Sequence, residues 1–147
     1  MVRRLVGLDV DHHRQTARRW FEAAQVDAFA CSHTCLPVFH SLPMARRRFT
    51  PIVLNNGAAG MPNVRGQASG LLTRVALCPF EGPERVLGLV REGVHMDAIE
   101  IRYDRQRWAE QFLRQWPEHS DAHDSYWERI AAGPSYDSTQ ALITSED

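Results

Sequence analysis

Lysine is absent from this chain, and all seventeen of its basic residues are arginine. Without lysine there is no Schiff-base nucleophile, no phosphate-binding lysine of the P-loop type and no lysine general base. Enzyme classes that depend on a lysine amine are therefore excluded before any motif is considered.

Cysteines and long apolar segments are also scarce. The three cysteines are an odd number and do not indicate a disulfide framework. No apolar run approaches the roughly 18 residues that a membrane span needs. The basic N-terminus has too few apolar residues before Asp9 to predict a signal peptide. We therefore expect a cytoplasmic protein in a reducing environment, with no membrane association.

The charge is nearly balanced, with seventeen basic and eighteen acidic residues and a formal net charge of −1. Such a balance provides no bulk electrostatic reason to bind nucleic acid, and no nucleic-acid specificity is evident. A hydrophobic content of 44% in 147 residues is typical of one globular domain. We expect a single α/β domain over residues 1–134, followed by a polar C-terminal tail over residues 135–147.

The N-terminal part predicts a βαβ unit. The apolar residues from Leu5 to Val10 predict a short buried strand, and Asp11 is placed to cap the helix that follows. Apolar residues then recur at helical spacing, at Ala17, Trp20, Phe21 and Ala24. The nearly continuous apolar run from Val26 to Cys31 is typical of a strand covered on both faces. Residues 4–32 therefore predict two parallel strands, with a ligand site beyond the carboxyl end of the second.

The rest of the chain predicts antiparallel strands and two closing helices. Short β segments suggest a meander over Ile52 to Leu54, Leu71 to Leu77, Arg85 to Val90, and Met96 to Tyr103. Glu92 and Gly93 predict a turn before the last of these segments. Asp104 and Ser120 are placed to cap the two helices, whose ends are predicted at Pro117 and at Gly133.

The candidate site begins where the second strand is predicted to end, in Cys31-Ser32-His33-Thr34-Cys35. His33 and Cys35 are two residues apart, so in an extended loop both side chains can face one cleft as metal ligands. By spacing alone, a polar loop with one packed thiol explains the segment better. The small residues of Asn55 to Asn63 predict a loop that either presents backbone N–H groups to a phosphate or braces its neighbour.

Four segments together resemble the C-terminal half of the calcineurin-like metallophosphoesterases. They are CSHTCLPV at 31–38, VLNNGAAGMPN at 53–63, GLLTRVAL at 70–77 and WPEHSDAHDSYWERIAAGP at 116–134. In that family a strand leads into a Gly-His-x-His loop with metal ligands, and Ser32-His33-Thr34-Cys35 stands in its place. The resemblance implies half of an α/β/β/α sandwich, with a βαβ unit, antiparallel strands and two C-terminal helices. It also implies hydrolysis of phosphate ester bonds.

The site that this resemblance implies holds two divalent metal ions, of Mn, Zn or Fe, which bridge a hydroxide and clamp the phosphoester. His33 and Cys35 are the implied metal ligands. A thiolate at Cys35, where the family has an imidazole, suits zinc or iron better than manganese. Asn55, Asn56 and Gly57 are the candidate substrate-binding residues. The family's catalytic histidine belongs to a motif outside this chain, so no catalytic residue is named.

The family's Asp-x-His, Gly-Asp-x-x-Asp and Gly-Asn-His motifs precede the part that this chain resembles. We therefore expect a truncated or split phosphoesterase whose dinuclear site is complete only with residues from outside the chain. Such a chain is expected to associate with itself or with an N-terminal partner half. One alternative is a non-catalytic remnant or interaction module. A second is a mononuclear structural zinc site formed by Cys31, His33, Cys35 and His40.

A dense polar group near the C-terminus offers a further candidate for metal binding, at His119, Asp121, His123 and Asp124. Residues two apart on a helix diverge by about 200°, so at most a subset of these side chains can converge. A solvated helix start, with His123 packed beside Tyr126, is the simpler interpretation.

Overall fold

The computed structural model of the chain describes residues 10–32, 34–45, 48–137 and 143–144. Its elements form a mixed α/β fold, as the sequence predicted. In chain order they are α1 (Val10–Ala24), β1 (Ala28–Cys31), β2 (Val38–Ser41), β3 (Ile52–Asn55), β4 (Ser69–Ala76), β5 (Arg85–Arg91), β6 (Val94–Arg102), α2 (Arg105–Gln115), α3 (Asp121–Ala132) and β7 (Ile143–Thr144). Among these residues no helix has both the length and the apolar character needed to cross a membrane.

The first sheet has four strands in the order β1-β3-β2-β7. β1 and β3 are parallel, and their last residues, Cys31 and Asn55, are register partners. β2 runs antiparallel to β3 and parallel to β7. The carboxyl ends of β1 and β3 therefore lie side by side at one edge of this sheet.

The second sheet has three antiparallel strands in the order β4-β6-β5. The β5–β6 hairpin turns at Glu92 and Gly93, whose φ values of 48° and 78° suit a tight hairpin turn, so the predicted turn is confirmed. The predicted meander is wrong in two respects, because β3 belongs to the first sheet and β4 pairs with β6. Pro79 and Pro83 in the β4–β5 connection disfavour a tight hairpin there, which leaves β6 as the central strand.

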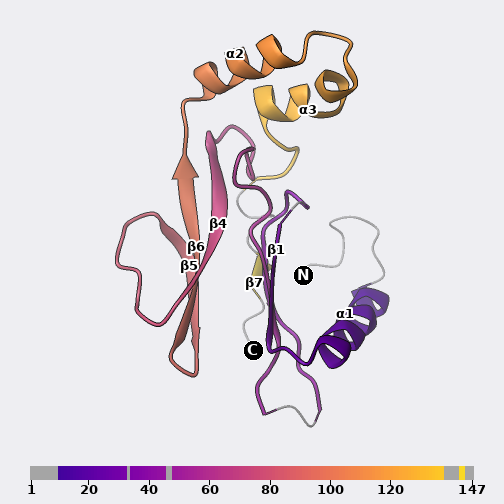
Figure 1. Cartoon of the computed structure of the whole chain (residues 1–147), viewed down its shortest axis with the longest axis vertical. Coiled ribbons are helices and arrows are strands. Elements are labelled where there is room, and N and C mark those ends of the chain that lie inside the picture. Colours follow the sequence, from indigo (N-terminus) through magenta and orange to yellow (C-terminus); the bar gives the residue numbers. More distant parts are fainter. Residues whose placement is uncertain (1–9, 33, 46–47, 138–142, 145–147) are drawn as a thin grey trace.

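The two sheets pack face to face, and α1 lies on the other side of the first sheet (Figure 1). Between the sheets the core is formed by buried apolar side chains from both, namely Phe39, Ile52, Leu54, Met96 and Ala98. On the opposite face of the first sheet, Phe21 of α1 contacts Phe29 of β1, with ring centroids 4.6 Å apart. The molecule therefore has three layers, a helix followed by two sheets.

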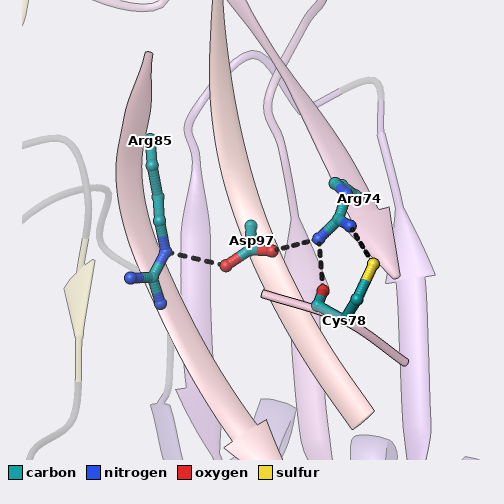
Figure 2. Close-up of polar contacts among 4 residues, drawn as sticks. All are labelled: Arg74, Cys78, Arg85 and Asp97. Atoms are coloured by element: carbon teal, nitrogen blue, oxygen red, sulfur yellow. Dashed lines mark hydrogen bonds and ion pairs between the residues drawn. The ribbon is translucent and has the colours of Figure 1, made fainter. Parts of the chain in front are cut away.

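A buried ionic cluster lies on the outer face of the second sheet. Met96 and Ala98 face the core, so the alternation of the strand points Asp97 outward. Its carboxylate is nevertheless fully buried, with Arg74 Nη1 2.9 Å from one oxygen and Arg85 Nε 2.8 Å from the other (Figure 2). Arg74 also donates to the carbonyl of Cys78 and lies 3.3 Å from its Sγ. The two guanidinium groups thus replace water around the carboxylate.

The C-terminal helices begin and end as predicted. The side chain of Asp104 accepts a hydrogen bond from Arg107 N, and that of Ser120 accepts one from His123 N. α2 ends at Gln115, just before Pro117, and Gly133 with φ of 83° is the C-cap of α3. Figure 1 places both helices beyond the ends of β4 and β6.

The predicted βαβ unit is only partly described, because residues 1–9 lie outside the described residues. α1 begins at Val10, so Asp11 lies within the helix and not at its N-cap. Of the predicted apolar face, Phe21 is buried whereas Trp20 is 62% exposed. In the described ranges the parallel partner of β1 is β3, and no helix connects the two strands.

β1 is covered on both faces in its first half, where Ala28 packs against the core and Phe29 contacts Phe21 of α1, whereas Ala30 and Cys31 are exposed. At the other edge of the first sheet, two residues of the segment predicted as a polar tail form β7, which pairs with Val38 and Phe39. The C-terminal segment is therefore part of the sheet at this point.

Candidate functional site

Two loops leave the adjacent carboxyl ends of β1 and β3, and hydrogen bonds join them. Asn56 N donates to the carbonyl of Cys31 over 3.2 Å. The carbonyl of Gly57 accepts from both Cys35 N and Ser32 Oγ, each over 3.3 Å. The predicted metal-ligand loop and the predicted substrate loop, distant in sequence, are thus neighbours in the structure.

The loop from Asn55 to Asn63 is braced by its own asparagine side chains. Asn55 Oδ1 accepts from Gly57 N, and Asn63 Oδ1 accepts from Ala58 N, both over 2.8 Å. Asn63 Nδ2 donates to the carbonyls of Asn56 and Ala58, while the Asn56 side chain donates to Leu71 O. All three asparagines are buried.

These contacts favour the interpretation in which the loop braces its neighbour over the one in which it presents free N–H groups to a phosphate. The N–H groups of Gly57 and Ala58 are already used within the loop, and Gly57 is itself buried. Gly57 has φ of 72°, and a Cβ there would lie 2.6 Å from Asn63 Oδ1, so the tight turn requires glycine. Substrate binding by Asn55, Asn56 and Gly57 stays a prediction.

The contact between this loop and β4 depends on the absence of a side chain at Gly70. Leu71 N donates to Ala58 O over 2.9 Å, and a Cβ at Gly70 would collide with the backbone carbonyl of Ala59. We expect Gly70→Ala to destabilise the fold by about 2 kcal/mol or more, because backbone must move to relieve the overlap. Urea unfolding measures the change.

Gly60→Ala is the matched control for this prediction, because a Cβ at Gly60 has no neighbour within 4 Å. We expect its unfolding free energy to stay within about 0.5 kcal/mol of the unsubstituted chain. Equal effects of the two substitutions would contradict the close approach of β4 to the loop.

Arg129 of α3 connects both loops to the C-terminal segment. Its Nη2 lies 2.9 Å from the carbonyl of Cys35, 3.0 Å from that of Pro62 and 3.2 Å from the Tyr136 hydroxyl. The Tyr136 hydroxyl also donates to Cys35 O. Sequence analysis missed both residues, because only the fold brings α3 and residue 136 to this edge of the sheet.

The predicted metal ligands are described only in part, since His33 lies outside the described residues. Cys35 is partly buried and has φ of 57°, a left-handed conformation within the loop. Cys31 is exposed as a residue, and partial desolvation of its thiol raises the pKa of that group. The convergence of His33 and Cys35 on one metal stays a prediction.

Within the described part of the chain, no group of three or more His, Cys, Asp or Glu side chains could hold a metal ion. Cys31, Cys35 and His40 are all described, so the mononuclear zinc alternative is not assembled from these three. Burial, with a further contribution from Arg14, lowers the pKa of His40 and favours its neutral form.

The described contacts of the His123 side chain at the start of α3 are with side chains of the same helix, as expected of a solvated helix start. His123 Nδ1 lies 3.2 Å from Asp124 Oδ1, and its ring stacks on Trp127 with centroids 5.8 Å apart. His123 therefore stacks on Trp127, and its packing beside Tyr126 stays a prediction.

A cleft with a volume of about 530 Å³ lies beside the two loops. One part of its lining comes from the loops, at Ser32, Cys35 and residues 57–61. The other part comes from α2, its C-cap and α3, with the apolar and aromatic side chains of Trp108, Phe112, Trp116, Tyr126 and Ile130. The cleft is therefore polar near Ser32 and Cys35 and aromatic toward the helices.

Comparison of the chain with models of protein families, with curated proteins and with solved structures finds no match. A functional interpretation therefore depends on the site geometry and on the resemblance described above.

Proposed function

We propose that this chain is the C-terminal part of a metal-dependent phosphoesterase, with His33 and Cys35 as metal ligands. The observation that carries the proposal is the convergence of two loops at the carboxyl ends of the parallel strands β1 and β3. Ligand sites of open α/β sheets lie at this edge. The cleft there is lined by Cys35 and by Gly57, one residue from each of the two segments proposed for metal and substrate.

The layered architecture agrees with the proposal only in its mixed α/β character. A helix layer followed by two face-to-face sheets gives three layers, which is more than the half of an α/β/β/α sandwich that the resemblance implies (Figure 1). On the outer face of the second sheet, Val90 is 45% exposed and Ile101 is 36% exposed. Val90 pairs with His95, six positions from Ile101 along β6, so the two residues do not form one continuous apolar patch. Association with a second copy or with an N-terminal partner half therefore rests on the resemblance alone.

The described residues do not by themselves fit a two-metal centre, because they contain no group of three metal-binding side chains. Cys35 supplies one thiol at the cleft, and a thiolate suits zinc or iron. The remaining ligands of the proposed centre therefore come from residues outside the described part of the chain, and His33 is one of them.

The first test is zinc binding by the whole chain, measured by titration calorimetry and by elemental analysis after gel filtration. We expect Cys35→Ser and His33→Ala to weaken zinc binding by about ten-fold or more, because each removes a ligand. Cys78→Ser is the matched control, since Cys78 is an exposed thiol away from the cleft. This control should retain the affinity of the unsubstituted chain.

Hydrolysis of an aryl phosphodiester, read on the same samples, separates the two candidate functions. The isolated chain is expected to show little turnover, and activity is expected to appear with a partner that supplies the absent motifs. If zinc binds with the same affinity in all the variants, His33 and Cys35 are not its ligands and the proposed centre is wrong. A non-catalytic interaction module would then be favoured. It is the second candidate function because the described residues contain no group of three metal-binding side chains.

A further inference from the structure

The helix side of the cleft is aromatic and uncharged. Trp108, Phe112, Trp116 and Tyr126 line it, and none of the described lining residues carries a charge. The rings of Phe112 and Trp116 are tilted against each other at 5.1 Å. Trp116 and Tyr126 remain 39% and 44% exposed, so both keep ring surface available to a ligand.

The loop side of the cleft consists largely of backbone. Residues 57–61 are small apart from Met61, and the N–H groups of Gly57 and Ala58 are used within the loop. Ala59 and Gly60 are exposed at the tip of the loop. A flat group lying on this loop would meet peptide groups on one side and aromatic rings on the other.

From this arrangement we infer that the cleft binds the planar aromatic substituent of a phosphoester, with the phosphate directed toward Ser32 and Cys35. The inference rests on the proposed function for the phosphate and on the cleft lining for the aromatic ring. Aromatic side chains stack on the π-face of a base or an aryl group. The volume of about 530 Å³ suits a ligand of nucleotide size.

The test compares three phosphoesters by NMR titration of the whole chain without added metal. Adenosine 5′-monophosphate carries a nucleobase, 4-nitrophenyl phosphate carries an aryl ring, and glycerol 3-phosphate has no ring. We expect at least one aromatic ester to bind about ten-fold more tightly than glycerol 3-phosphate. Preference for the first ester identifies a nucleobase as the substituent, and comparable affinity for both identifies an aryl ring in general.

Trp116→Ala and Tyr126→Ala should each remove most of this preference, by a factor of about five to ten. Both side chains are partly exposed, so their removal leaves the core intact, which circular dichroism and urea unfolding can verify. Trp20→Ala is the matched control, because Trp20 is 62% exposed on α1 and lies outside the cleft lining. Equal affinity for all three esters, or an unchanged preference in both cleft variants, would overturn the inference.

Adenosine and 4-nitrophenol, which lack a phosphate, separate this inference from the proposed function. If they bind through Trp116 and Tyr126 and a phosphate adds affinity, the whole inference is supported. If they bind equally well without the phosphate, the inference that the ligand is a phosphoester is overturned, whereas the proposed metal centre is decided by the zinc titration of Cys35→Ser and His33→Ala.

Discussion

Asp97→Ala is expected to lower the free energy of unfolding by about 2–4 kcal/mol. The carboxylate is fully buried and forms charge-assisted hydrogen bonds with Arg74 and Arg85 (Figure 2). Removing one partner of a buried ion pair leaves uncompensated charge in the interior and costs several kcal/mol. The expected loss is smaller than for a fully buried pair because the Arg74 and Arg85 side chains remain 23% and 39% exposed and can reach water.

Urea unfolding of Asp97→Ala, with Arg102→Gln as the matched control, measures this effect. Arg102 also forms an ion pair at 2.8 Å, with Glu100, but its side chain is 82% exposed. A surface pair of this kind contributes about 0–1 kcal/mol. A loss of less than about 1 kcal/mol in Asp97→Ala would show that the cluster is not a buried ionic centre.

The geometry around Asp97 also explains the glycine at position 88. Gly88 is the register partner of Asp97 on β5, and a Cβ there would collide with the Arg85 guanidinium. Arg85 therefore reaches the carboxylate across a residue without a side chain. This arrangement makes the cluster dependent on strand register as well as on the three charged residues.

Arg129→Met is expected to destabilise the chain by about 2–4 kcal/mol. The substitution keeps much of the apolar stem but removes the donors to the carbonyls of Cys35 and Pro62 and the contact with Tyr136. A hydrogen bond from a charged group contributes about 1.5–3 kcal/mol to the free energy of unfolding. The carbonyls of Cys35 and Pro62 also lose a donor that offsets the cost of removing them from water. The loss should be concentrated in the two loops that Arg129 connects.

Urea unfolding and amide hydrogen exchange together measure this prediction. Faster exchange is expected at Cys35 N and Ala58 N, whose hydrogen bonds depend on the position of the two loops. Arg107→Met is the control, because Arg107 is exposed on α2 and should change stability by no more than about 0.5 kcal/mol. Unchanged exchange in the loops of Arg129→Met would show that they are held in place independently of α3.

Local signals in the sequence predicted the ends of the two C-terminal helices and one turn correctly, whereas the predicted N-cap of α1 at Asp11 was wrong. Asp104 and Ser120 cap α2 and α3, and Glu92-Gly93 forms the β5–β6 turn. Each of these features depends on residues within a few positions of one another, so the chemistry that determines it is visible in a short segment. The segments of β1, β3, β4, β5 and β6 were also predicted as strands, whereas β2 and β7 were not.

Strand pairing depended on the tertiary structure. β3 reads as one more strand of an antiparallel series, yet it pairs with β1 and β2, while β4 pairs with β6. A strand's partners depend on which faces can be buried together, and here Phe39 and Leu54 must meet Met96 and Ala98. The same global requirement brings β7 from the predicted polar tail to the edge of the first sheet.

The sequence by itself determined the mixed α/β class, the ends of the C-terminal helices and the two loop segments of the candidate site. Only the tertiary structure brought those loops together at the ends of β1 and β3, with Arg129 and Tyr136 behind them and an aromatic wall beside them. Periodicity and capping act over a few residues, whereas these contacts join positions as far as 101 residues apart. Such contacts form only when whole elements bury their apolar faces against one another.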